Sequence, residues 1–131
     1  MAPVAKHVYG VEIVPSAIQD AKQNALINHF DNTTFECGKA EEVIIEWKQK
    51  GIEPDVIMVD PPRKGCDQVF IETLLELAPK RIIYISCNPS TQQRDAQLLA
   101  NLYYLKEITP VDMFPHTTHI ETVALFERKT L

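Results

Sequence analysis

The sequence has few cysteines and too few positive charges for some classes of protein. Its three cysteines, Cys37, Cys66 and Cys87, are widely spaced and form no Cys-X-X-Cys pair. We therefore expect neither a disulfide framework nor a zinc or redox motif built on paired cysteines. The 18 acidic residues outnumber the 13 basic ones and give a formal net charge of −5. This balance argues against a dedicated nucleic-acid clamp, which needs clustered lysine and arginine.

Long hydrophobic runs are absent as well. No stretch approaches the roughly 18 consecutive apolar residues of a membrane-spanning helix. The opening residues, MAPVAKHVYG, lack the charged start and long apolar stretch of a secretory signal. We therefore expect a cytoplasmic protein with no membrane partner. With 45% hydrophobic and 24% charged residues, the 131-residue chain is predicted to fold as one globular domain.

The sequence contains an alternation of strand-like and helix-like segments. Strands are predicted over residues 7–14, 33–38, 55–60 and 81–87, which are rich in apolar and β-branched residues. Helices are predicted over 15–30, 40–51, 68–78 and about 90–101. Residues 103–129 are predicted to form two further strands around a loop at 115–119.

This alternation predicts an α/β domain with a mostly parallel sheet. The last two strands have no helix between them, so we expect an antiparallel pair at one edge. Ligands of open α/β sheets bind beyond the carboxyl ends of the strands. Glu12, Asp60 and Cys87 lie at the ends of three predicted strands. We therefore expect these three side chains to converge on one rim.

Three motifs in the second half of the chain resemble those of a known enzyme family. DPPRKG (60–65), SCNPST (86–91) and HTTHIETVALFER (116–128) have the order and spacing found in the RNA uridine-C5 methyltransferases. The segment YGVEIVPSAIQDAKQNALIN (9–28) is similar to that family's cofactor-binding region. The resemblance spans about residues 7–129. It implies a Rossmann-like methyltransferase fold, S-adenosylmethionine as cofactor, and 5-methyluridine formation in rRNA or tRNA.

The same resemblance implies that parts of such an enzyme are missing. The family's methyltransferase domain begins with a strand and a Gly-rich turn, which lie upstream of the present sequence, as does an RNA-binding domain. We therefore expect residues 1–131 to be a partial methyltransferase domain that meets RNA through the full-length protein and is inactive alone. The missing central strand predicts that strands 7–14 and 55–60 pair directly, or that the chain forms a homo-oligomer.

The resemblance assigns the chemistry to Cys87 and Glu121. Adding a thiolate to C6 of uracil makes C5 carbanion-like, and Cys87 is the expected nucleophile. Its alternative role is that of a small buried residue at a strand end. Glu121 is implied as the general base that removes the C5 proton. Its alternatives are a solvated glutamate on an edge strand or a metal site with His116 and His119. No metal is expected, because the mechanism needs none.

Cofactor-binding roles fall to two acids. Asp60, held in a rigid turn by the two prolines that follow it, matches an acid that contacts the cofactor. Its alternative role is that of a strand-terminal cap. Glu12 is suited to the ribose hydroxyls, as acids after the second strand are in related folds.

Substrate contacts are expected from three residues near the thiol. Arg63 is expected either to meet RNA phosphates or to lie in a solvated loop. Asn88 and Thr91 are expected to orient a uridine that has left its stack. Two rival interpretations stay open: an amino-group methyltransferase and a non-catalytic fragment or assembly module. The first would place an aromatic residue after the prolines, where this sequence has Arg63.

Overall fold

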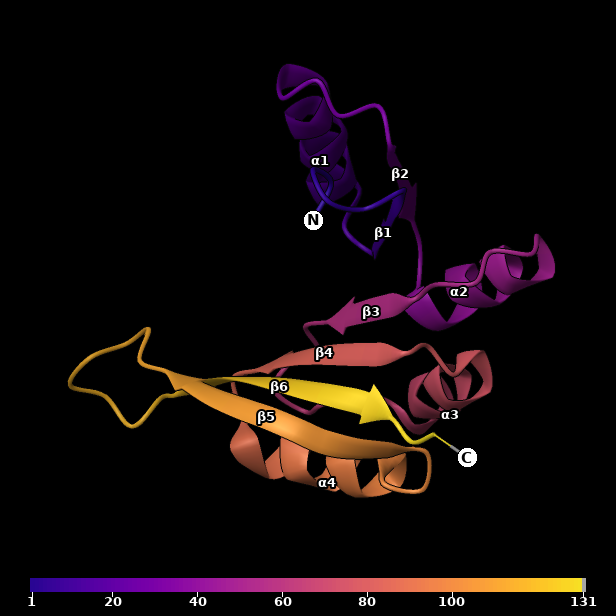
Figure 1. Cartoon of the computed structure of the whole chain (residues 1–131). Coiled ribbons are helices and arrows are strands. Elements are labelled where there is room, and N and C mark those ends of the chain that lie inside the picture. The colour runs from indigo at the N-terminus through magenta and orange to yellow at the C-terminus, as the bar shows by residue number, and fades with distance from the viewer. Residues whose placement is uncertain (131) are drawn as a thin grey trace. The chain divides into compact units, whose positions relative to one another are not determined.

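Helices and strands alternate along the chain in the computed structural model, which describes residues 1–130 (Figure 1). The chain divides into two compact units, Met1–Gly51 and a second that begins at Ile52. The elements are β1 (Val8–Glu12), α1 (Pro15–Ile27), β2 (Thr33–Cys37), α2 (Ala40–Gln49), β3 (Val56–Val59), α3 (Gln68–Leu77), β4 (Arg81–Ser86), α4 (Pro89–Leu99), β5 (Tyr103–Val111) and β6 (Glu121–Arg128).

The first unit is a parallel β1–β2 pair with helices α1 and α2. Helix α1 begins at Pro15, because a proline fits the first turn, where no backbone N–H is needed. It ends at Ile27, three residues before the predicted end. His29 there adopts a φ of 59°, a left-handed conformation that stops the helix. Helix α2 buries Trp47, whose ring centroid lies 5.3 Å from that of Tyr9 on β1.

The second unit is built on a four-stranded sheet with the order β3-β4-β6-β5. Strands β3 and β4 are parallel, whereas β6 runs antiparallel to both β4 and β5. The predicted α/β fold with an antiparallel C-terminal pair is therefore confirmed. The pair comprises 17 residues by its bounds, Tyr103–Val111 and Glu121–Arg128, so the loop between them covers 112–120 rather than 115–119.

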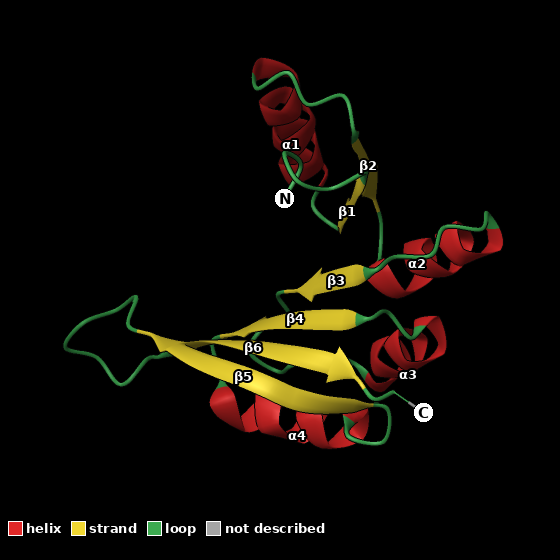
Figure 2. Ribbon diagram, in the orientation of Figure 1, coloured by secondary structure: helices red, strands yellow, loops and turns green. Residues whose placement is uncertain are grey.

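Helices α3 and α4 cover one face of this sheet (Figure 2). Burial along β4 has a period of two: Ile82, Tyr84 and Ser86 are buried, whereas Ile83 and Ile85 are less so. This is the pattern of a strand with only one well-covered face. The core comprises Val59, Cys66, Ile71, Leu74, Ile82, Tyr84, Leu99, Tyr103, Ala124 and Phe126.

The single sheet expected from the sequence is found as two, β1–β2 and β3-β4-β6-β5. Within its own unit, β1 pairs with β2, and β3 pairs with β4. The direct pairing of strands 7–14 and 55–60 stays a prediction. Association with a second copy stays a prediction.

Candidate active site

Cys87 lies in a tight turn between β4 and α4, one residue beyond the end of the strand. The Ser86 hydroxyl accepts a hydrogen bond from the Asn88 N–H and donates one to the Asn88 carbonyl, both at 2.9 Å. Asn88 Oδ1 accepts the Ser90 N–H at 3.1 Å and so caps α4, which begins at Pro89. These short-range bonds fix the backbone that carries the thiol, and the Cys87 side chain is half-buried.

Cys87 and Glu121 adjoin the last pair of the antiparallel β4–β6 ladder. In that ladder, Ile85 pairs with Val123 and Ser86 with Thr122. Cys87 follows Ser86 directly beyond the end of β4, and Glu121 precedes Thr122 as the first residue of β6. A thiol and a carboxylate thus flank the same strand pair at the rim of the sheet.

The face that these two residues share is the one turned away from α4. Their neighbours Ser86 and Thr122 are buried on the helix side, where the Thr122 hydroxyl donates to Gln92 Oε1 at 2.6 Å. Gln92 in turn donates to the Tyr84 carbonyl at 3.1 Å. Because side chains alternate between faces, the next pair along points to the open face. A shallow hollow of about 180 Å³ lies on that face, lined by Ile83, Glu107, Thr109, Val123 and Leu125.

The loop that follows β3 is fastened to α4 through its backbone carbonyls. Asn88 Nδ2 and Thr91 Oγ1 lie 3.2 and 3.1 Å from the carbonyl oxygen of Arg63. Arg94 Nη2 donates to the carbonyls of Lys64 and Cys66, at 3.0 and 3.2 Å. The loop that carries Asp60 and Arg63 and the helix that follows Cys87 are therefore one connected piece.

A buried carboxylate, Asp95, closes this connection. It is 0% exposed, and its Oδ2 accepts the Cys66 N–H at 2.8 Å and the Tyr84 hydroxyl at 2.6 Å. Its Oδ1 lies 2.7 Å from Arg94 Nη2. Hydrogen bonding to Asp95 raises the pKa of the Arg94 guanidinium. Each carboxylate oxygen thus has a charged or polar donor, as a buried charge requires.

Gly65 is required at the point where this loop passes Asp95. Its φ is 82°, a left-handed conformation that favours glycine. A Cβ added there would lie 2.6 Å from Arg94 Nη2 and 2.8 Å from Asp95 Oδ2. The glycine of the DPPRKG motif therefore allows the close approach that the network needs.

The three thiols differ in environment. Cys66 is buried in the core, and burial is the main cause that raises the pKa of its thiol to about 12. It is therefore a neutral hydrophobe at physiological pH rather than a nucleophile. Cys37 is exposed, with its sulfur 3.6 Å from the Ile13 carbonyl. Of the three, Cys87 alone adjoins the end of the β4–β6 ladder, whose last pair is Ser86–Thr122.

The remaining predicted site residues lie as follows. Asp60 and Arg63 are exposed in the loop after β3. Glu12 is the last residue of β1 in the first unit, and its Oε1 accepts the Val14 N–H at 3.1 Å. The convergence of Glu12 with the other two strand-end residues stays a prediction. Asn88 and Thr91 bind the Arg63 carbonyl, and their contact with a uridine also stays a prediction.

Sequence reasoning missed Gln92, which bonds α4 to the sheet, and Arg94 and Asp95, which join α4 to the loop after β3. A signal was present, because Gln92, Asp95 and Leu99 are spaced i, i+3 and i+7 and so share one helix face. Leu99 is fully buried, which makes that face the core face. Polar residues at core-facing positions of a helix indicate a buried polar network.

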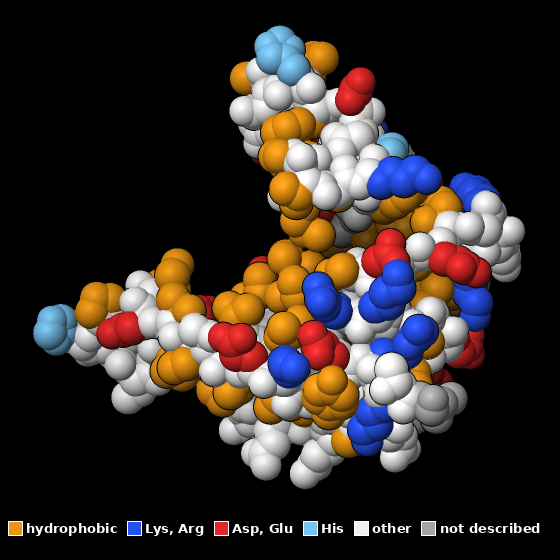
Figure 3. Space-filling view, in the orientation of Figure 1, with side chains coloured by type: hydrophobic (Ala, Val, Ile, Leu, Met, Phe, Trp, Pro, Cys, Tyr) orange, Lys and Arg blue, Asp and Glu red, His pale blue; other side chains and the backbone are white. Residues whose placement is uncertain are grey.

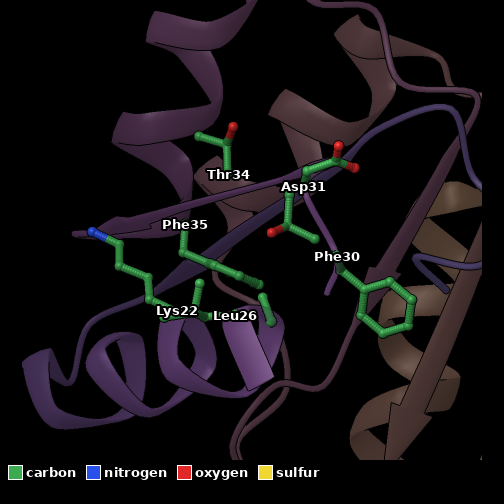
Figure 4. A pocket seen from close by; sticks show the side chains of 8 residues that line it. Lys22, Leu26, Phe30, Asp31, Thr34 and Phe35 are labelled. Carbon is green, nitrogen blue, oxygen red and sulfur yellow. The ribbon is translucent and has the colours of Figure 1, made fainter. Parts of the chain in front are cut away.

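No group of three or more His, Cys, Asp and Glu side chains that could hold a metal ion is found within residues 1–130. The same described part of the chain contains no helix long and apolar enough to cross a bilayer. A hollow of about 460 Å³ lies in the first unit between α1 and β2 (Figure 4), and no predicted site residue lines it. The lining includes Lys22, Leu26, Phe30, Asp31, Thr34 and Phe35.

Comparison with known families gives one match over nearly the whole chain. The family model described as tRNA (Uracil-5-)-methyltransferase matches residues 1–129. An uncharacterised RNA methyltransferase of Staphylococcus aureus strain MRSA252 is 76% identical over 129 residues, and one of Staphylococcus epidermidis is 75% identical. These alignments cover 98% of this chain and 28% of each relative, so the chain spans about a quarter of their length.

Solved structures are similar in fold. The tRNA (uracil-54, C5)-methyltransferase of Pyrococcus abyssi, in complex with S-adenosyl-L-homocysteine, is 35% identical with a TM-score of 0.80. The match covers 95% of this chain and 30% of that one. An rRNA methylase from Streptococcus thermophilus has a TM-score of 0.73 at 10% identity, over 98% of this chain and 77% of that one. At that identity the similarity concerns the fold alone.

Proposed function

Because the chain belongs to the tRNA (uracil-5-)-methyltransferase family, we propose that it carries the reaction centre for methylation of uridine at C5 in rRNA or tRNA. The observation that carries the proposal is the β4–β6 register, whose last pair, Ser86–Thr122, adjoins both Cys87 and Glu121. C5 and C6 of uracil are bonded to each other, so a nucleophile for one and a base for the other must be close neighbours. Residues on opposite strands of one ladder meet that condition.

The chemistry divides between the two side chains. The Cys87 sulfur adds to C6 and forms a C–S bond, which pushes the ring electrons toward C5. C5 would then take the methyl group as the methyl–sulfonium bond of the donor breaks and a neutral thioether leaves, so that C5 carries both a methyl and a proton. Glu121 removes that proton, the electron pair re-forms the C5–C6 double bond, and the thiolate leaves C6. Cys87 and Glu121 thus act in order, with the carboxylate needed only after methyl transfer.

S-Adenosylmethionine is the cofactor of this proposal and supplies an electrophilic methyl group. The donor set fits it, since Glu12 and Asp60 present carboxylates at the carboxyl ends of β1 and β3, where ligands of α/β sheets bind. Glu12 is assigned the ribose hydroxyls and Asp60 another part of the cofactor. The Pro61–Pro62 pair and the bonds from α4 hold the loop that positions Asp60.

RNA is the proposed substrate. Arg63 and Lys64 are exposed in the loop that hydrogen bonds from α4 hold near Cys87. These two side chains can contact RNA phosphates, and the proposal does not depend on a larger cluster of lysine and arginine. Asn88 and Thr91 keep the same loop in place and are assigned to the ring of the flipped uridine.

The test is a covalent trap in the complete protein. Fluorine at C5 of uridine cannot be removed as a proton is, so the reaction of a 5-fluorouridine RNA with S-adenosylmethionine stops at the Cys–C6 adduct. We expect a stable RNA–protein adduct that Cys87→Ala abolishes and that Cys37→Ala, a control at an exposed thiol, leaves intact. No adduct from protein that binds the cofactor would contradict the proposal and favour amino-group methylation.

A further inference from the structure

The loop between β5 and β6, residues 112–120, presents hydrophobic and aromatic side chains to solvent. It projects beyond the end of the sheet, and histidine and hydrophobic atoms cover its tip (Figures 1 and 3). Met113 is 61% exposed and Phe114 is 52% exposed. Such side chains next to a rim with a proposed reaction centre need a partner that covers flat apolar surface.

The loop is held in one shape by its own hydrogen bonds. The Thr117 hydroxyl donates to the Phe114 carbonyl at 2.7 Å and accepts the His119 N–H at 3.2 Å. The Phe114 and His119 rings are in edge-to-face contact, with centroids 6.3 Å apart. His116 at the tip has a φ of 66°, a conformation that few residues other than glycine adopt. The Phe114 ring is therefore oriented before any partner binds.

The charges of the loop restrict what it can bind. Residues 112–120 contain no lysine or arginine, and Asp112 carries their only full charge at neutral pH. Attraction to phosphates therefore cannot come from this loop, whereas Arg63 and Lys64 lie in the loop fastened to α4. Stacking of a nucleobase on an aromatic ring needs no charge and suits every base.

The position of the loop selects its partner within the RNA. It leads directly into Glu121, the residue before Thr122, and Thr122 pairs with Ser86, the residue before Cys87. Phe114 is seven residues from Glu121, so its backbone is at most about 25 Å away. That distance reaches a nucleotide near the target uridine. A uridine that leaves its stack also leaves a neighbour with one face uncovered.

We propose that loop 112–120 is a stacking platform for an unpaired base next to the target uridine, with Phe114 as the stacking ring and His119 as the residue that orients it. The inference rests on the proposed function and deepens it, because it assigns base contact to the apolar loop and phosphate contact to Arg63 and Lys64. A base held on Phe114 keeps the strand in register while the uridine is at Cys87.

The test uses the complete protein and short single-stranded RNAs that carry 2-aminopurine at one position beside the uridine. Stacking on Phe114 is expected to quench the fluorescence of this base. Phe114→Leu keeps an apolar side chain without a ring and is expected to abolish the quenching and weaken binding about 5- to 150-fold. Phe114→Tyr keeps the ring and is expected to restore both. Tyr104→Leu, at an aromatic residue on β5 that is 44% exposed, is the matched control and is expected to change neither.

Salt dependence provides a second readout. Phe114→Leu is expected to leave the slope of log Kd against log salt unchanged, whereas Arg63→Ala is expected to reduce it by about one phosphate contact. Unchanged binding and quenching in Phe114→Leu, or an equal loss in Tyr104→Leu, would overturn the platform. If the wild-type protein forms the 5-fluorouridine adduct, such a result refutes the platform alone. A wild-type protein that binds no RNA and forms no adduct refutes the proposed function as well.

Discussion

Replacement of Gly65 by alanine tests whether the loop after β3 depends on close approach to Asp95. The φ of 82° alone penalises an L-residue by about 1–2 kcal/mol, less about 0.4–1 kcal/mol for the stiffer unfolded chain. The new Cβ would also lie 2.8 Å from Asp95 Oδ2, which already accepts the Cys66 N–H and the Tyr84 hydroxyl. Hydrogen bonds to charged groups contribute about 1.5–3 kcal/mol each.

Gly51 is the matched control. Its φ is 79°, close to that of Gly65, and a Cβ added there would have no atom within 4 Å. Gly51→Ala therefore carries the conformational cost without the contact, about 1.6 kcal/mol at most. We expect Gly65→Ala to lower the free energy of unfolding by at least about 2 kcal/mol more than Gly51→Ala does.

The assay is urea unfolding of the two variants, followed by far-UV circular dichroism. Amide hydrogen exchange at Cys66 adds a local readout, because that N–H is the one bonded to Asp95. We expect Gly65→Ala to speed exchange at Cys66 and Gly51→Ala to leave it unchanged. Equal losses of stability in the two variants, with Cys66 still protected, would refute the reasoning from close approach.

Three further outcomes are expected. Glu121→Gln removes the base but keeps the size of the side chain, so an RNA with ordinary uridine should accumulate as a methylated covalent adduct, seen by denaturing electrophoresis. Release of methylated RNA at the wild-type rate would exclude Glu121 as the base. With a pKa of about 12, Cys66 has about one thiolate in ten thousand molecules at pH 8, so brief alkylation should label Cys37 and Cys87 and spare it by mass spectrometry. Burial raises the pKa of Cys66 from 9.0 and of Tyr103 from 10.0 to about 12, so the folded state keeps protons that the unfolded state gives up. These two groups should therefore contribute their whole stabilisation below pH 9, and the free energy of unfolding should fall as pH rises from 9 through 12. Cys66→Ser should make this fall shallower, and a free energy of unfolding that does not change with pH would contradict the prediction.

The alternation of strands and helices was predictable because it depends on short-range features of the chain. Short apolar runs at 56–59 and 82–85, rich in β-branched residues, indicate strands, and Pro15 and Pro89 begin helices because a proline fits the first turn. The end of α1 was harder to predict, since nothing in the sequence requires His29 to adopt a left-handed conformation.

The candidate nucleophile and base could be named from motifs, but their positions relative to each other in the sheet could not be predicted. Cys87 and Glu121 are 34 positions apart, and the register of β6 against β4 brings the residues next to them, Ser86 and Thr122, into one pair. Register depends on which side chains fill the core, here Tyr84 beside Ala124 and Ile82 beside Phe126, and that packing involves the whole sheet.

The sequence by itself determined the element order, the family and the residues with reactive groups, because these depend on residue types and on spacing along the chain. The tertiary structure decided that the Cys87 thiol is half-buried at the rim of the sheet and that the Cys66 thiol is buried in the core. It also decided that Asn88, Thr91, Arg94 and Asp95 fasten the loop after β3. Burial and hydrogen bonding are properties of what surrounds a side chain, and a linear sequence does not contain that environment until the chain has folded.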